Sequence, residues 1–155
     1  MLSVEADLDL MRTLSGAEFI NLFGKGKFPQ FSTVDDHLGQ TVVTAEPGRV
    51  ELAWTPTEKL CNPGGMIHGG YVAMILDNAV CFASASTLDR FIPQLTLNLN
   101  IDYLRPVAPG QTYTVIGTNA HGGRTRLVSN ATIVDSRGKL LAQAGGSTLP
   151  NPAFK

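Results

Sequence analysis

The sequence predicts an α+β fold in which one antiparallel sheet curls around one long hydrophobic helix. A helix-length apolar segment lies at about residues 69–86, a strand hairpin precedes it, and four strand-like segments follow it. Helices and strands segregated in this way, with short turns between consecutive strands, are typical of α+β domains. With 155 residues the chain is long enough for one core but hardly for two.

A helical extension is predicted at residues 1–30, followed by the main domain at residues 31–155. Apolar side chains recur in the extension at mixed helical spacing, and Gly16 interrupts the pattern. These side chains are Leu8, Met11, Phe19, Leu22 and Phe23. One or two amphipathic helices are expected there. The GKGKFP stretch that follows contains two glycines and a proline and is predicted to be a loop.

A hairpin is predicted between Thr41 and Thr55, because Pro47-Gly48 separates two runs of strand-favouring residues. Residues 56–67 are rich in proline and glycine and are expected to form an irregular loop. The helix that follows is apolar on nearly every side, which predicts that it is buried.

Four strands are predicted after Pro93, and turn residues separate them. The strand segments are 94–106, 111–121, 124–136 and 139–149, and the turns contain Pro109-Gly110, Gly122-Gly123 and Ser136-Arg137-Gly138. Connections of hairpin length favour antiparallel pairing of consecutive strands.

Composition excludes several classes of partner. The net charge is -1 with no run of basic residues, so no nucleic acid is expected as a partner. No run of about 18 apolar residues is present, and no basic start followed by an apolar run precedes the domain, so a cytoplasmic protein without a membrane partner is expected. Only 16% of the residues are charged, which favours burial of further surface by self-association.

Asp77 is the first candidate for chemistry, because it lies in the middle of the apolar helix. Burying a carboxylate costs several kcal/mol unless it is paired, hydrogen-bonded or protonated. One interpretation is a general base or nucleophile. The alternative is that Asp77 and Asn78 form a narrow solvated stripe on the helix.

The segment from Asn62 to Gly70, NPGGMIHGG, is the second candidate, because its glycines leave the first backbone N–H groups of the helix open. Such a helix start suits a negative charge that develops on a carbonyl oxygen. Gly69 or Gly70 would donate its N–H group, and Asn62 could add an amide donor or position a water molecule. His68 is interpreted more simply as a structural residue that caps the helix.

The spacing of these candidates predicts a site made by two chains. Gly69 and Asp77 are eight residues apart, about 12 Å along a helix, too far to act on the same carbonyl group. A two-fold dimer with antiparallel helices would bring Asp77 of one chain to Gly69 of the other.

From about Leu38 to Thr148 the sequence resembles the hotdog-fold acyl-CoA thioesterases, in particular the branch with the phenylacetic-acid-pathway thioesterases. The strongest element is the N-x-x-G-x-x-H-G-G-x-x-x-x-x-x-D spacing from Asn62 to Asp77, and residues 98–106 and the GGRTRL turn extend it. The resemblance implies a hotdog fold, a sheet wrapped around a long central helix, and thioester hydrolysis at a site between subunits of a dimer or tetramer.

The resemblance also implies roles for individual residues. Asp77 would act as base or nucleophile, Asn62 would orient the water or the thioester, and Thr96 would help to orient the attacking water. The Gly69 region would polarise the carbonyl group. No separate cofactor is expected, since coenzyme A is part of the substrate.

Further positions are candidates for binding the substrate. Arg124, Arg126 and Arg105 are candidates for the phosphates of coenzyme A, although solvated charges on an exposed strand explain the first two equally well. The candidates for the acyl pocket lie on the central helix and are Tyr71, Met74, Cys81 and Phe82.

The same residues and motifs also bear on other possible functions of the chain. The sequence has no G-x-S-x-G, H-E-x-x-H or P-loop motif, and Cys61 and Cys81 do not have metal-ligand spacing, so neither a serine hydrolase nor a metal site is expected. Two alternatives stay open. One is a hotdog-fold enoyl-CoA hydratase or dehydratase that pairs His68 with Asp77, and the other is a non-catalytic acyl-CoA-binding protein.

Overall fold

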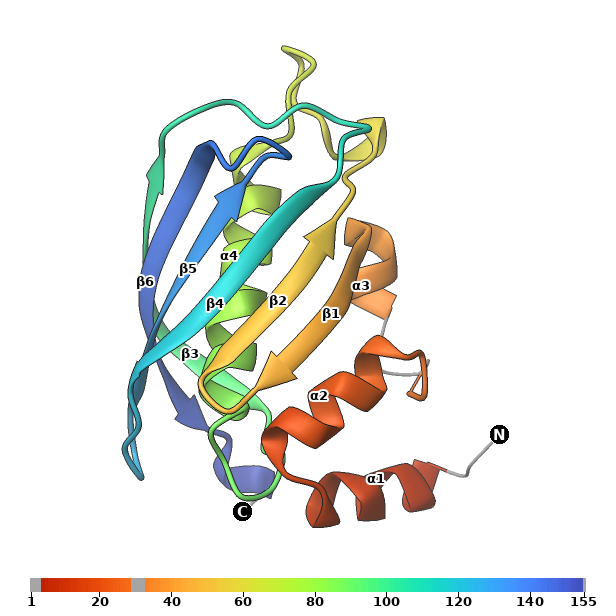
Figure 1. The fold of residues 1–155 in the computed structure, drawn as a ribbon, viewed down its shortest axis with the longest axis vertical. Helices are drawn as coiled ribbons and strands as arrows, with labels where there is room; N and C mark the ends of the chain where they lie inside the picture. Colours follow the sequence, from red (N-terminus) through yellow and green to blue (C-terminus); the bar gives the residue numbers. More distant parts are fainter. Residues whose placement is uncertain (1–3, 29–32, 155) are drawn as a thin grey trace.

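The computed structural model describes residues 4–28 and 33–154. The predicted boundary between residues 30 and 31 lies outside this range. The helices are α1 (Val4–Thr13), α2 (Gly16–Gly24), α3 (Thr33–Leu38) and α4 (Gly69–Ala85), with short 3-10 turns at Glu58–Leu60 and Pro152–Phe154. The strands are β1 (Gln40–Glu46), β2 (Arg49–Trp54), β3 (Gln94–Tyr103), β4 (Tyr113–His121), β5 (Leu127–Val134) and β6 (Leu140–Pro150) (Figure 1).

The six strands form one antiparallel sheet in the order β1-β2-β4-β5-β6-β3. The predicted hairpin is confirmed, because Glu46 pairs with Arg49 across a two-residue turn. Gly48 in this turn has φ +85, a conformation that glycine adopts without strain. The predicted α+β architecture, one sheet around one long helix, is likewise confirmed (Figure 1).

The prediction that all four C-terminal strands are joined by hairpins is wrong for the first connection. β3 pairs with β6 at the edge of the sheet and not with β4. The segment 104–112 crosses the end of the sheet instead (Figure 1). Its backbone is tied to the loops before α4, since Ile67 N donates to Val107 O at 2.9 Å and Gly110 N to Pro56 O at 2.8 Å. Those bonds replace the pairing that a hairpin would make.

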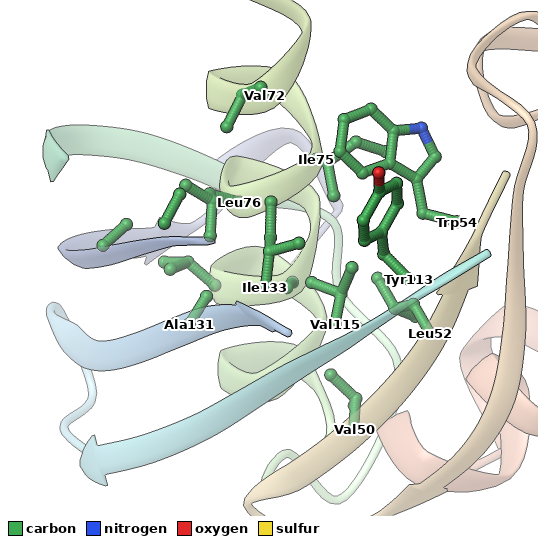
Figure 2. Close-up of a cluster of buried hydrophobic side chains, with 14 of the residues drawn as sticks. Val50, Leu52, Trp54, Val72, Ile75, Leu76, Tyr113, Val115, Ala131 and Ile133 are labelled. Atoms are coloured by element: carbon green, nitrogen blue, oxygen red, sulfur yellow. The ribbon is translucent and has the colours of Figure 1, made fainter. Parts of the chain in front are cut away.

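One face of α4 packs against the concave face of the sheet and forms the core. Figure 2 shows Val72, Ile75 and Leu76 of α4 among side chains of β2, β4 and β5. The strand residues labelled there are Val50, Leu52, Trp54, Tyr113, Val115, Ala131 and Ile133, all of them buried. The helix lies so close to β4 that a Cβ atom at Gly117 would be 2.3 Å from Ala79 O. Glycine is therefore required at this point of the sheet.

The prediction that α4 is buried on all sides is wrong for the single chain, because the sheet covers only part of the helix. Four residues spaced by three or four positions form a stripe that is left uncovered. They are Gly70, Met74, Asp77 and Cys81. Met74 is 40% exposed, and Asp77 and Cys81 are partly exposed. The central carboxylate of the helix therefore lies on an open face.

The N-terminal residues form two helices, α1 and α2, in agreement with the one or two that were expected. Ser15 caps α2 in a capping box with Glu18. Gly16 follows directly and packs so tightly that an added Cβ atom would meet Ala85 O at 1.8 Å. Asn21 of α2 exchanges two hydrogen bonds of 2.8 Å with the backbone N–H and C=O of Ala45 on β1. Helix α2 thus covers one edge of the sheet, where unpaired backbone groups would otherwise be exposed.

The short helix α3 was not predicted, and it brings Asp35 against Gln40 and Asn78. Within residues 4–28 and 33–154, no helix has both the length and the apolar character needed to cross a membrane.

Candidate active site

Asp77 lies in the third turn of α4, and its carboxylate contacts strand β3. Thr96 Oγ1 donates a hydrogen bond of 2.7 Å to Asp77 Oδ1. Cys81, one turn further along α4, has its Sγ atom 3.4 Å from Thr96 Oγ1. Because the Thr96 proton is directed to the carboxylate, the Cys81 S–H group is the donor in the second contact. Asp77 Oδ2 has no hydrogen-bond partner among the described residues, so one oxygen is held and the other is open.

The Cys81 thiol is kept neutral by its surroundings. Burial and, second, the neighbouring Asp77 carboxylate raise the pKa of Cys81 to about 11, while the Thr96 hydrogen bond acts in the opposite direction. A thiol needs its thiolate form to act as a nucleophile. Cys81 is therefore a donor within this cluster and not an attacking group at neutral pH.

Asn62 lies in the tight loop before α4, and the loop orients its side chain. Its Oδ1 atom accepts hydrogen bonds from the backbone N–H groups of Gly64 at 2.8 Å and Met66 at 3.4 Å. Gly65 at φ +80 lets the loop close, and Asn62 N donates to Met66 O at 2.8 Å. The Nδ2 group of Asn62 donates to no residue that the structure describes. The side chain is thus fixed through its oxygen, and its two N–H donors are available.

The first turn of α4 contains a second available donor. His68 is the N-cap residue, and its Nδ1 atom accepts a hydrogen bond of 3.0 Å from Gly70 N. The Gly70 N–H group is therefore occupied, and His68 has the contact expected of a helix cap. Gly69 N donates to none of the described residues. Of the two backbone groups considered for a developing charge, Gly69 is the one that is free.

Asn62 and Gly69 line the same pocket, which has a volume of about 290 Å³ and also includes Tyr103 and Arg105. The Tyr103 hydroxyl donates to Gly69 O at 3.1 Å and fixes the strand against the helix start. The sequence did not identify Tyr103 as a site residue, because only the pairing of β3 with β6 brings it next to α4. Arg105 donates to Leu140 O from the same region.

The candidate residues fall into two separate groups in one chain. The donor pair consists of Asn62 and Gly69 at the start of α4. The Asp77–Thr96 pair holds the carboxylate. Gly69 and Asp77 both belong to α4 and are eight residues apart, about 12 Å along its axis. His68 and Asp77 do not contact each other either, since His68 bonds to Gly70 and Asp77 to Thr96.

Arg124 and Arg126 lie far from Arg105. They lie in the connection between β4 and β5, which is at the opposite end of the sheet from the connection between β3 and β4, where Arg105 lies (Figure 1). Both arginines are exposed, and Arg126 donates to Ser147 Oγ at 2.9 Å. One chain therefore does not gather the three arginines around one ligand.

The four candidates for the acyl pocket also separate. Met74 and Cys81 lie on the open stripe of α4, and Tyr71 packs between the rings of His37 and His68 with ring centroids 6.0 and 6.5 Å away. Only Phe82 lines a large pocket, of about 470 Å³, between α4 and the N-terminal helices.

A polar cluster that the sequence did not predict lies beside this pocket. Asp35 Oδ1 accepts hydrogen bonds from Gln40 Nε2 at 2.8 Å and Asn78 Nδ2 at 3.4 Å, and Asn78 also donates to Gln40 Oε1 at 3.1 Å. Burial and, second, the charge of Asp36 raise the pKa of Asp35 to about 6. The only signal in the sequence was Asn78, a polar residue in an otherwise apolar helix.

No group of three or more histidine, cysteine, aspartate or glutamate side chains in the described ranges could hold a metal ion. Cys61 and Cys81 are both free thiols.

Comparison with known proteins places these residues in a family. The family model described as the thioesterase superfamily matches residues 64–142, a span that contains Asp77 and Thr96. Human acyl-coenzyme A thioesterase 13 is 30% identical over 104 residues, which cover 66% of this chain and 74% of that protein.

Solved structures agree with this assignment. The Escherichia coli PaaI protein from the phenylacetic acid degradation operon superposes with a TM-score of 0.75 at 22% identity, covering 86% of this chain and 95% of that one. The protein smu.793 of Streptococcus mutans, solved bound to acetyl CoA, has a TM-score of 0.65 at 29% identity and covers 70% and 85% of the two chains. The chain therefore belongs to the thioesterase superfamily, with the hotdog fold and the thioester hydrolase class that its sequence resemblance implies.

Proposed function

We propose that the protein is an acyl-CoA thioesterase whose active site combines Asp77 and Thr96 of one subunit with Asn62 and Gly69 of a second. The observation that carries the proposal is the separation of these two groups. Within the described ranges, Asp77 is bonded to Thr96 and to neither of the two free donors. Gly69 lies about 12 Å away along the same helix, and Asn62 lies in the loop before it.

The two groups together match the requirements of thioester hydrolysis. Attack on the thioester carbonyl places negative charge on its oxygen, which the Gly69 N–H and the Asn62 amide can stabilise. The N-terminal end of α4 adds the favourable field of the helix dipole. On the opposite side of the carbonyl, Asp77 Oδ2 either removes a proton from the attacking water or attacks the carbon itself.

Both routes give the same products. With Asp77 as base, the water oxygen bonds to the carbonyl carbon, the water proton passes to Asp77, and the C–S bond breaks to release coenzyme A as thiolate. With Asp77 as nucleophile, its oxygen displaces the thiolate and forms an anhydride that water then cleaves. Label from ¹⁸O water that enters the Asp77 side chain over repeated turnovers would identify direct attack.

The exposed surface around Asp77 supports self-association. β3 is an uncovered edge strand, in contrast to β1, which α2 and Asn21 cover. Leu95 and Leu97 on β3 are 44% and 52% exposed, and Met74 on the open stripe of α4 is 40% exposed. An uncovered strand edge beside apolar side chains is a surface that proteins normally bury. A two-fold dimer through this face would bring two α4 helices together in antiparallel orientation.

The relatives support coenzyme A as the leaving group. Human acyl-coenzyme A thioesterase 13 is named for this activity, and the Streptococcus mutans protein binds acetyl CoA. Arg105 lies in the same pocket as Gly69 and is the first candidate to contact the phosphates of coenzyme A. Arg124 and Arg126 could reach the same coenzyme only from the other subunit of a dimer, or from a further pair in a tetramer.

Mixing two inactive chains tests the shared site. Asp77→Asn and Asn62→Ala homodimers should each lose most hydrolysis, measured as coenzyme A release with a thiol-reactive dye over a panel of acyl-CoAs. Refolding them together should restore about a quarter of the native activity, since half of the dimers are mixed and each mixed dimer has one intact site out of two.

A matched control changes both members of the Asp77–Thr96 pair, one in each chain. Mixing Asp77→Asn with Thr96→Val leaves neither site with an intact Asp77–Thr96 pair, so activity should not recover. Recovery in the control, or none in the first mixture, would contradict the shared site. Hydration of an enoyl-CoA without coenzyme A release would favour the hydratase, and binding of acyl-CoA without any turnover would favour a binding protein.

A further inference from the structure

The turn between β5 and β6 lines a pocket that adjoins the pocket of Asn62 and Gly69. This turn pocket has a volume of about 400 Å³, and its walls include residues of the segment 104–112 and of the turn 135–139. Arg105 and Pro106 line both pockets, so the two are neighbours. Figure 1 shows the turn at the end of the sheet where α4 begins. A ligand bound at Gly69 can therefore extend past Arg105 into the turn pocket.

The lining of the turn pocket is mainly cationic. Arg105, Arg137 and Lys139 line it, together with one carboxylate, that of Asp135, and the amide of Gln111. Three cations against one carboxylate leave the lining with a net positive charge. Arginine and lysine are the side chains that proteins use to bind phosphate. The turn pocket thus has the charge that a phosphate group requires.

The shape of the turn is set by Asp135 and by the backbone. Asp135 Oδ1 accepts hydrogen bonds of 2.9 Å from the backbone N–H groups of Arg137 and Lys139. Asp135 N donates to Lys139 O at 3.0 Å, and Gly138 at φ +76 lets the turn close. None of these contacts uses the side chain of Arg137 or Lys139. Both side chains can therefore be replaced without loss of the bonds that form the turn.

The two cations of the turn are available to a ligand. Arg137 Nε lies 3.9 Å from Asp135 Oδ2, a long contact, and the arginine side chain is 83% exposed. Lys139 Nζ makes no hydrogen bond or ion pair with a residue that the structure describes. Neither side chain has a strong partner of its own to give up on binding an anion.

The structure of coenzyme A matches this arrangement of pockets. Its pantetheine arm separates the thioester from the diphosphate, and the 3′-phosphate on the ribose lies further still from the thioester. When the carbonyl oxygen is at Gly69, the nucleotide end must therefore lie beyond the pocket of Gly69. Arg105 stands between the two pockets and suits the diphosphate, whereas Arg137 and Lys139 lie in the part of the turn pocket contributed by the other strands.

We infer that Arg137 and Lys139 bind the 3′-phosphate of coenzyme A and make the protein prefer coenzyme A thioesters to thioesters of phosphopantetheine on a carrier protein, which lack this phosphate. The inference rests on the thioesterase function proposed above and deepens it. Because the two side chains bind far from the reacting carbonyl, they contribute equally to binding the substrate and its transition state. They are specificity residues and take no part in bond cleavage.

Two substrates that differ only in the 3′-phosphate test this inference. With the fastest acyl-CoA of the panel and its 3′-dephospho form, the native protein should show a kcat/KM about 10-fold higher for the phosphorylated substrate, mainly through a lower KM. Higher salt should reduce this preference, since it screens exposed charges. In the double variant Arg137→Ala/Lys139→Ala the preference should fall to near unity, with the rate on the dephospho substrate nearly unchanged.

The double variant Lys25→Ala/Lys27→Ala is the matched control. Lys25 and Lys27 also flank a glycine of positive φ, Gly26 at +70, and both are exposed, but neither lines the turn pocket. The control should keep the native preference. Equal rates for the two substrates in the native protein, an unchanged preference in Arg137→Ala/Lys139→Ala, or an equal loss in the control would overturn the inference while leaving the thioesterase function intact.

A binding measurement keeps the test independent of hydrolysis. Adenosine 3′,5′-bisphosphate carries the nucleotide end of coenzyme A with its 3′-phosphate, and adenosine 5′-monophosphate lacks that phosphate. Calorimetry should show about 10-fold tighter binding of the bisphosphate to the native protein, and no such difference in Arg137→Ala/Lys139→Ala. If no acyl-CoA is hydrolysed, this result would still support the phosphate site. Equal binding of the two nucleotides to the native protein would overturn it.

Discussion

The Thr96 hydroxyl on β3 donates a hydrogen bond of 2.7 Å to Oδ1 of Asp77 on α4. This bond links the central helix to the uncovered edge strand of the sheet. It occupies one carboxylate oxygen and leaves Oδ2 directed elsewhere, so the orientation of Asp77 depends on the position of β3. Any partner that pairs with β3 therefore also fixes the geometry of the carboxylate.

Thr96→Val removes this hydrogen bond with almost no change in side-chain volume. We expect kcat to fall roughly 10- to 100-fold, the usual effect of losing a hydrogen bond to a charged group, with a much smaller change in KM. Thr96→Ser keeps the hydroxyl group and should recover most of the rate. Steady-state release of coenzyme A measures both variants. An unchanged kcat in Thr96→Val would mean that Asp77 is oriented by other contacts.

Cys81 should be dispensable for the chemistry, although it lies 3.4 Å from Thr96. Because its pKa is raised to about 11, only about one thiol in a thousand is ionised at pH 8. Cys81→Ala should retain hydrolysis within a few-fold of native, and iodoacetamide at pH 8 should leave Cys81 unmodified, as read by mass spectrometry. Rapid alkylation together with loss of activity would make Cys81 a reactive thiol instead.

Most of the fold followed from local patterns in the sequence. The hairpin at Pro47-Gly48 and the helix starting at Gly69 were predicted because turn residues and apolar periodicity act within a few positions. The place of β3 at the sheet edge was not, because it depends on pairing between Tyr103 and Ala142, residues far apart in the chain. The sequence alone carried no signal for this non-local register.

The candidate site was predictable where it consists of one continuous motif. Asn62, Gly69 and Asp77 share such a motif, and the structure adds which of their atoms are free. Asp35 was missed, because its partners Gln40 and Asn78 come together only when α3 packs next to α4. A polar residue in an apolar helix signals a partner but does not identify it.

The raised pKa of Asp35, about 6, predicts a pH-dependent stability. The folded chain binds this proton more tightly than the unfolded chain, so the contribution of Asp35 to stability is fully present below about pH 4. It is lost as the pH rises from about 4 to about 6. Asp35→Asn cannot ionise. Between pH 4 and pH 7 its free energy of unfolding should therefore rise by about 2 kcal/mol relative to that of the native protein, after allowance for screening by water.

Urea unfolding of both proteins at pH 4, 5, 6 and 7 measures this difference directly. Other carboxyl groups titrate in the same range, but they are common to both proteins and cancel in the comparison. Asp36→Asn serves as the control and should show a smaller change, because Asp36 is exposed. A difference between native protein and Asp35→Asn that is constant with pH would show that burial does not affect the Asp35 proton.

Substitutions at Gly69 separate the role of its N–H group from the role of its small size. A Cβ atom at Gly69 would lie 3.5 Å from Tyr103 Cε1, an ordinary contact, so Gly69→Ala should fold and keep its rate within a few-fold. Proline is tolerated at the first position of a helix, and His68 at φ -60 and ψ 135 has the extended conformation that a following proline requires. Gly69→Pro should therefore fold as well, but without the donor.

Loss of one donor to the developing oxyanion typically lowers kcat about 100- to 1000-fold, which is the result expected for Gly69→Pro. Circular dichroism and thermal unfolding check that all three proteins are folded, and coenzyme A release gives kcat. Equal loss in Gly69→Ala and Gly69→Pro would mean that the substrate needs the space at this position. Full activity in Gly69→Pro would exclude the Gly69 N–H as the oxyanion donor and would leave the Asn62 amide as the group that stabilises the charge.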